Sequence, residues 1–117
     1  MSERTLDLVL KGFWYDLIKS GVKREEYREV TPYWCKRILY SHSRGSMPIT
    51  YWNIALVLVS RKELLIKDHN TPTYVRFRRG YTKESMLFKI DDISIGIGKA
   101  ELGAPQEEVF IIKFSEI

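Results

Sequence analysis

The chain has 117 residues, which suits one compact domain with a real core and leaves little room for a second domain. Hydrophobic residues make up 44% and charged residues 29%, a composition typical of globular proteins and unlike that of disordered chains. The formal charge of +4 is mildly basic and favours an anionic partner such as nucleic acid or a nucleotide.

The first residues and the cysteine content limit the classes of protein further. Cys35 is the single cysteine, which excludes an internal disulfide and a cysteine-based zinc site. No apolar segment typical of a secretory signal follows the first five residues, and the longest strongly apolar run, 54–59, is too short to span a bilayer. We therefore expect a cytoplasmic protein that does not enter a membrane.

The first predicted elements are a strand, a short helix and a second strand. Three leucines between residues 6 and 10 alternate with other residues, as in a half-buried strand. Apolar residues recur at helical spacing over 13–18, and Gly21 is placed to end that helix. Residues 25–30 alternate again, which predicts a second strand with every other side chain on one face.

A second helix is predicted directly after that strand. Thr31 and Pro32 suit its start, because threonine caps helices and proline at the first position needs no N–H donor. Tyr33 and Arg37 are four residues apart and would share an exposed face of this helix. We expect the helix to end near Tyr40.

The segment 41–72 has the least decisive pattern in the chain. It begins with a polar, loop-like stretch and becomes apolar over 54–66, where a buried helix and a pair of strands both fit. A helix over 51–59 is the favoured interpretation.

The remainder of the chain predicts β-structure. Residues 74–79 alternate up to Gly80, and apolar residues then occupy even positions up to 90 and odd positions from 93. This change of parity at Asp91–Asp92 predicts a bulge. Residues 109–114 are apolar on both faces, which is typical of a strand inside a sheet. The order of elements predicts one α+β domain, a barrel-like mixed sheet flanked by short helices.

The motif Gly21-x-Lys23-x-x-Glu26-x-Arg28 resembles the G-x-K-x-x-E-x-R signature of the ASCH domains, within the PUA-like superfamily of small β-barrels. Segments 77–81 and 98–105 also look like late segments of small bacterial and phage members. The resemblance covers roughly 5–40 and 73–117. It implies a single PUA-like mixed β-barrel over 1–117, with a lineage-specific insert at about 41–72.

The resemblance also implies a cleft that is lined by the signature residues and holds RNA or a nucleotide-like ligand. Some ASCH members are hydrolases, which remove acyl groups from modified nucleosides or cut RNA. On the amidohydrolase branch, the position three after the lysine tends to carry a hydroxyl residue. Glu26 occupies that position here and departs from the pattern.

The signature residues can also be interpreted without the resemblance to the ASCH family. Lys23 after a turn glycine is a candidate phosphate contact or base, or simply an exposed lysine. Glu26 and Arg28 share a strand face, so they are expected to pair with each other, or with Arg76 or Arg78 on another strand. A neighbouring arginine favours the ionised carboxylate, which argues against Glu26 as a proton donor.

A second candidate surface lies on the strand that precedes Gly80. Arg76 and Arg78 on that strand could contact phosphates while Tyr81 stacks on a base, and Tyr33 and Arg37 could extend the same surface. The alternative is a solvated strand face.

Other notable residues are interpreted as structural. Trp14 and Trp34 fall at core positions, where packing is favoured over a role as stacking platforms. Gly96 and Gly98 either permit a close backbone approach by a helix or ligand or mark a bend, and the bend is the favoured interpretation. His42 and His69 have no companions at ligand spacing, so we expect neither a metal ion nor another cofactor.

The favoured function is a binding module for RNA or a nucleotide, because the sequence supplies anion contacts but no activated nucleophile. The residues expected to bind are Lys23, Glu26, Arg28, Tyr33, Arg37, Arg76, Arg78 and Tyr81. The alternative is a small hydrolase, a ribonuclease or modified-nucleoside amidohydrolase, with Lys23 and Glu26 as catalytic residues. A third possibility is a protein partner bound through the insert at 41–72.

Overall fold

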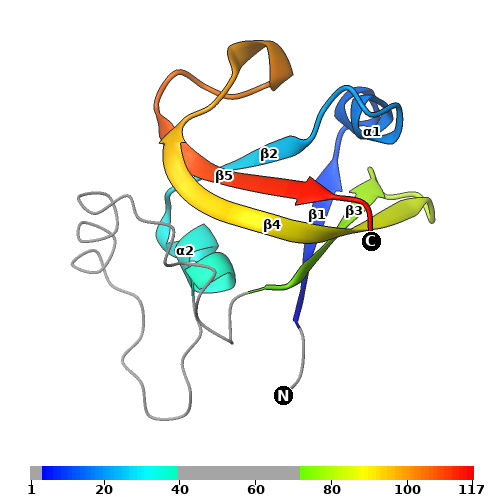
Figure 1. Cartoon of the computed structure of the whole chain (residues 1–117), viewed down its shortest axis with the longest axis horizontal. Helices are drawn as coiled ribbons and strands as arrows, with labels where there is room; N and C mark the ends of the chain where they lie inside the picture. Colours follow the sequence, from blue (N-terminus) through cyan, green and yellow to red (C-terminus); the bar gives the residue numbers. More distant parts are fainter. Residues whose placement is uncertain (1–3, 40–71) are drawn as a thin grey trace.

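The computed structural model of the chain describes residues 4–39 and 72–117 (Figure 1). In chain order the elements are β1 (Thr5–Leu10), α1 (Gly12–Lys19), β2 (Glu25–Glu29), α2 (Pro32–Leu39), β3 (Tyr74–Arg79), β4 (Ser85–Ile97), the 3-10 helix η2 (Ala100–Leu102) and β5 (Glu108–Ser115). The strands and helices predicted on these residues are confirmed. The helix predicted over 51–59 lies outside the described residues.

The five strands form one mixed sheet in the order β1-β3-β4-β5-β2. β1 and β3 are parallel, and the other neighbouring strands are antiparallel. The sheet curls, with β4 drawn as a long arc around one side of the molecule (Figure 1). β1 and β2 are the two ends of this order, and no ladder joins them among the described strands. The α+β class is therefore confirmed, and the sheet is a curled half-barrel.

The predicted bulge lies in β4. Ile90 pairs with Phe114 whereas Asp92 pairs with Lys113, so β4 has one residue more than β5 between these pairs. Phe88 before the bulge is buried, as are Ile93 and Ile95 after it, whereas Ile97 at the end of the strand is exposed. The extra residue lets one long strand keep its apolar side chains on the core face while it bends.

The main core fills the concave side of the sheet. Phe77, Phe88 and Phe114 form its aromatic centre, with ring centroids 4.8 to 5.9 Å apart. The other buried members come from all the described strands except β2 and from both α-helices: Leu6, Leu8, Leu10, Tyr15, Ile18, Ile38, Val75, Ile93, Ile95, Phe110 and Ile112. A smaller cluster on the other face of β5 contains Tyr27, Ala104, Val109 and Ile111. β5 is therefore buried on both faces, as its apolar sequence predicts.

Helix α1 ends where the sequence predicts, but its buried face differs from the expected one. Tyr15 and Ile18 are buried, whereas Phe13 is exposed. Gly21 has a φ of +91°, a conformation that glycine adopts at little cost, and the N–H of Lys23 bonds to the carbonyl of Leu17. This turn carries the chain directly from α1 into β2, so Lys23 lies just before the strand.

Helix α2 begins with the predicted cap. The hydroxyl of Thr31 accepts a hydrogen bond from the N–H of Trp34 at 3.2 Å. Ile38 is buried in the core, while Tyr33 is exposed, and the Arg37 guanidinium carbon lies 5.5 Å from the Tyr33 ring centroid. α1 precedes β2 and α2 follows it, so the two helices stand at opposite ends of that strand (Figure 1).

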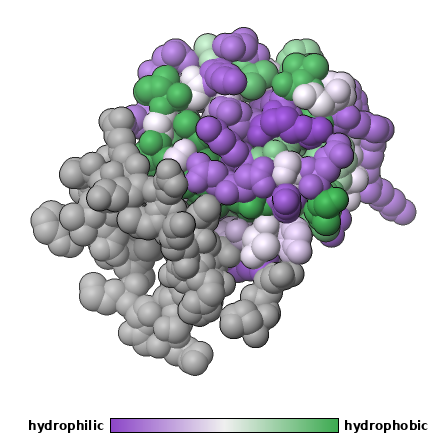
Figure 2. Space-filling view, viewed as in Figure 1, coloured by the Kyte–Doolittle hydropathy of each residue, from purple (hydrophilic) through white to green (hydrophobic). Residues whose placement is uncertain are grey.

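Gly98 fits the close-approach alternative of the sequence prediction. A Cβ at this position would lie 2.5 Å from Cε1 of Tyr27 and 2.7 Å from the Cβ of Ala104. The glycine therefore allows the Tyr27 ring to pack directly against the chain after β4. On the face shown in Figure 2, hydrophobic residues of the described part form small separate patches within a largely hydrophilic surface. None of the helices described is both long and apolar enough to cross a membrane.

Candidate ligand-binding cavity

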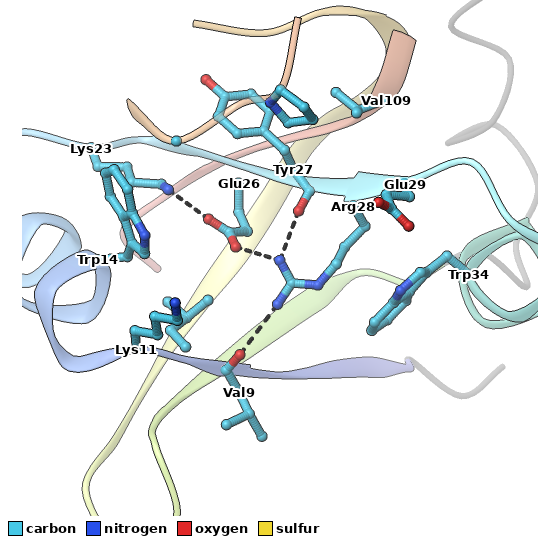
Figure 3. A pocket seen from close by; sticks show the side chains of 13 residues that line it. Val9, Lys11, Trp14, Lys23, Glu26, Tyr27, Arg28, Glu29, Trp34 and Val109 are labelled. Atoms are coloured by element: carbon cyan, nitrogen blue, oxygen red, sulfur yellow. Dashed lines mark hydrogen bonds and ion pairs between the residues drawn. The ribbon is translucent and has the colours of Figure 1, made fainter. Parts of the chain in front are cut away.

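A cavity of about 440 Å³ lies where β1 and β2, the two ends of the sheet, approach each other (Figure 3). This volume falls in the range of ligand pockets, roughly 300–1,000 Å³. The lining residues come from β1, α1, β2, α2, β5 and the segments that precede α1, precede β2 and follow η2: Val9, Leu10, Lys11, Trp14, Lys23, Glu26, Tyr27, Arg28, Glu29, Trp34, Gly103, Pro105 and Val109.

The three charged signature residues form one ion-paired group in the cavity wall, here called the triad. Nζ of Lys23 lies 2.7 Å from Oε1 of Glu26, and the other carboxylate oxygen is in close contact with Nη1 of Arg28. The side chains of Lys23, Glu26 and Arg28 are 2%, 8% and 17% exposed. The alternation of β2 puts Glu26 and Arg28 on one face, and the Gly21 turn brings Lys23 beside them.

The buried ammonium of Lys23 contacts three groups of the protein. Besides Glu26, its ammonium donates to the carbonyl of Leu102 at 2.6 Å and lies 4.3 Å from the Trp14 ring centroid. A buried ammonium needs such partners, because removing a charge from water without compensation is costly. The lysine thereby attaches η2 to the start of β2 and closes one side of the cavity.

Arg28 connects the two ends of the sheet. Its Nη1 donates to the carbonyl of Tyr27 at 2.7 Å, and its Nη2 donates to the carbonyl of Val9 on β1 at 3.3 Å (Figure 3). The guanidinium carbon also lies 5.2 Å from the Trp34 ring centroid. One side chain thus bridges the open side of the half-barrel and forms part of the cavity wall.

Both tryptophans line the cavity, a role in addition to the core packing expected for them. Trp14 comes from α1 and Trp34 from α2, and they stand at opposite ends of the triad (Figure 3). Trp34 also packs against the main core, while Trp14 remains only partly buried. Sequence periodicity marks an apolar face but does not separate core from cavity wall, so it favoured packing over a place in the site.

Two further charged residues line the cavity and were not predicted. Lys11 immediately precedes α1 and Glu29 ends β2, and both are exposed. Neither side chain has a hydrogen bond or an ion pair with another described residue. Their position at strand–helix junctions beside the signature is the sequence signal that could have identified them.

Tyr27 faces the opposite side of β2 from Glu26 and Arg28. Its hydroxyl donates to the Glu25 carboxylate at 2.7 Å and accepts from the N–H of Lys99 at 3.3 Å. Burial, followed by the hydrogen bond to Glu25, raises the pKa of Tyr27 well above its ordinary value. These contacts hold the segment that carries Gly103 and Pro105 against β2.

The predicted surface on β3 lies apart from the cavity. Arg78 pairs with Asp7 at 3.2 Å, Arg76 donates to the Ser85 hydroxyl at 3.4 Å, and Tyr81 is 97% exposed. None of the three β-hairpin residues Arg76, Arg78 and Tyr81 lines the cavity. A pairing of Glu26 with Arg76 or Arg78 is not found, because β4 and β5 separate β3 from β2 in the sheet.

Tyr33 and Arg37 are also separate from the triad. With Arg4, Thr5 and Leu6 they line a second cavity of about 460 Å³. The Arg4 guanidinium donates to the carbonyl of Arg37 at 2.7 Å, and burial together with the nearby Arg37 charge lowers the pKa of Arg4. The predicted ligand-binding set is therefore divided over three places.

Within the described ranges, no group of three or more His, Cys, Asp or Glu side chains is arranged to hold a metal ion. His42 and His69 lie outside these ranges. No protein-family model matches the chain, and neither a curated protein nor a solved structure matches it.

Proposed function

We propose that the chain is an ASCH-type, PUA-like domain that binds RNA or a nucleotide in the cavity beside the triad. One observation carries this proposal: the signature residues Lys23, Glu26 and Arg28 line a single cavity. Solvated charges on an open strand would not be 2% to 17% exposed. The proposal keeps 1–117 as one domain, and a role for 41–72 in binding a protein partner stays a prediction.

The aromatic and cationic groups of the wall suit a nucleobase. Bases stack on aromatic rings and on arginine guanidinium planes, and each such contact contributes about 1–3 kcal/mol. Trp34 and Arg28 together offer both kinds of surface at one end of the cavity, and Trp14 offers a ring at the other. Lys11 adds a cation that no described residue neutralises.

The contacts within the triad favour binding over hydrolysis. Glu26 has a cation at each carboxylate oxygen, and the Lys23 ammonium is shared among a carboxylate, a carbonyl and an indole ring. A general base must have a lone pair within reach of the substrate. Proton transfer by either residue would require the buried pair to separate, so we assign the triad to the shape and charge of the cavity.

A titration with single-stranded RNA and with mononucleotides at two salt concentrations tests the proposal. We expect saturable binding that weakens with salt as phosphate contacts release counterions. The variant Trp34→Leu should weaken binding about tenfold through lost stacking. Tyr81→Leu, which removes an exposed aromatic ring outside the cavity, is the matched control and should bind normally.

Two results would contradict the proposal. Binding that depends on Tyr81 and Arg78 but not on Trp34 would move the site to the β-hairpin. Cleavage of the RNA, or release of acyl groups from acylated nucleosides, would favour the hydrolase alternative if it disappears in Lys23→Met.

A further inference from the structure

We infer that the cavity holds a nucleotide unit in one orientation, with its phosphate beside Lys11 and an amino-bearing base beside Glu29. This inference rests on the proposed function and adds to it the direction of the ligand and its base preference. Adenine, cytosine and guanine would be accepted, and uracil would be disfavoured.

The triad leaves two charged lining residues for a ligand to contact without breaking an existing pair. The charges of Lys23, Glu26 and Arg28 act on one another and on backbone carbonyls. Lys11 and Glu29 line the same cavity, are exposed, and have no side-chain partner among the described residues. A ligand can therefore pair with these groups without breaking an ion pair within the protein.

These two free charges lie at opposite ends of the cavity. Lys11 lies at the start of α1 on the Trp14 side, and Glu29 lies at the end of β2 on the Trp34 side (Figure 3). The ligand they fit has an anion at one end and hydrogen-bond donors at the other. A nucleotide has this polarity when its base carries an amino group.

At the Lys11 end the surroundings favour a phosphate. The first turn of α1 contains no acidic residue, and no side chain caps it. The partial positive charge of a helix start therefore adds to the charge of Lys11 and is not cancelled locally. Lysine is a common phosphate contact that acts as a point charge.

At the Glu29 end the surroundings favour an amino-bearing base. A carboxylate accepts hydrogen bonds from amino groups such as N4 of cytosine. Uracil has carbonyl oxygens on both sides of its single ring N–H, and these repel a carboxylate. Trp34 and Arg28 line the same cavity and supply an aromatic ring and a guanidinium plane on which a base can stack.

Calorimetric titration of the full chain with AMP, CMP, GMP, UMP and adenosine tests the Lys11 end and the Glu29 end of the cavity separately. We expect UMP to bind about tenfold more weakly than the other nucleotides, and adenosine about tenfold more weakly than AMP. Lys11→Gln should abolish the difference between AMP and adenosine while UMP remains disfavoured. Glu29→Gln should abolish the discrimination against UMP, because an amide can donate to a carbonyl oxygen.

Matched charge changes outside the cavity are the controls. Lys83→Gln and Glu101→Gln alter exposed residues elsewhere and should leave both affinity ratios within about twofold. A trinucleotide with a central adenosine, titrated alongside, distinguishes a strand from a free nucleotide by binding more tightly than AMP. The orientation predicts the same effects of Lys11→Gln and Glu29→Gln on either ligand.

The failure of this inference is distinguishable from failure of the proposed function. If none of the nucleotides or RNAs binds, both are wrong. If they bind but the two ratios are unchanged in Lys11→Gln and Glu29→Gln, the proposed function stands and the orientation is wrong. An exchange of the two effects between the variants would likewise overturn the orientation.

Discussion

Arg28 on β2 donates a hydrogen bond to the carbonyl of Val9 on β1, and so connects the two strands that end the sheet. The same guanidinium also contacts Glu26 and the carbonyl of Tyr27. Because the planar guanidinium has donors in several directions, one side chain can serve all three acceptors. The open side of the half-barrel is therefore held by the residue that also forms the cavity wall.

Arg28→Lys should destabilise the protein although it preserves the charge. An ammonium on a shorter stem cannot reach both carbonyls and the carboxylate, so a buried acceptor loses its donor at a cost of about 1–3 kcal/mol. Urea denaturation measures the change in the free energy of unfolding. Arg78→Lys, at an exposed arginine with a single carboxylate partner, should change it by less than about 0.5 kcal/mol. Equal effects of the two substitutions would refute the bridging role.

Glu26→Ala should be among the most destabilising single changes in the described part of the chain. It leaves the buried Lys23 and the partly buried Arg28 without their shared carboxylate, and breaking a buried pair costs about 3–5 kcal/mol. Thermal and urea unfolding provide the measurement. Glu101→Ala, at an exposed glutamate, should be close to neutral. A small loss of stability in Glu26→Ala would mean that water replaces the carboxylate, and it would contradict the burial of the triad.

Gly98→Ala and Gly96→Ala form a pair that separates packing from backbone effects. The Cβ at 98 would overlap Tyr27 and Ala104, and overpacking typically costs about 1–3 kcal/mol. The Cβ at 96 would meet its nearest neighbour, Cδ1 of Ile111, at an ordinary 3.7 Å. We therefore expect a clear loss of stability at 98 and little change at 96. An equal loss of stability at both positions would show that the contact with Tyr27 is not its cause.

Stability at high pH should depend on Tyr27. Its pKa is raised in the folded state, so the unfolded chain loses this proton first, at about pH 10. The contribution of this proton to stability is present below pH 10 and is lost as the pH rises towards the pKa of the folded state. Tyr27→Phe should reduce the slope of stability against pH above 10. It should also lower stability at neutral pH by about 1–2 kcal/mol, because the N–H of Lys99 loses its acceptor.

Tyr81→Phe is the control for the alkaline measurement, because the Tyr81 side chain is 97% exposed. It should leave both the slope and the stability at neutral pH unchanged. Burial also raises the pKa of Tyr15, so a smaller alkaline slope should persist in Tyr27→Phe. An unaltered slope in Tyr27→Phe would contradict the assignment.

The sequence does not predict the environment of a residue when the same local pattern fits more than one environment. Gly98 fits a bend and a close contact alike, and the position of Tyr27 decides between them. The apolar residues of α1 include Phe13 and Trp14, yet the helix turns Tyr15 and Ile18 to the core. In each case the missing information is which distant element packs against the residue.

The sequence by itself determined the local structure. The alternation of leucines in β1, the change of parity in β4, the glycine that ends α1 and the shared face of Glu26 and Arg28 follow from backbone periodicity and from steric limits on φ. Only the tertiary structure decided the cavity. Lys23 donates a hydrogen bond to the carbonyl of Leu102, which is 79 residues away in the sequence, and Arg28 donates one to the carbonyl of Val9, which is 19 residues away. Such contacts depend on how the strands order themselves and how far the sheet curls, which the whole core determines and no short segment encodes.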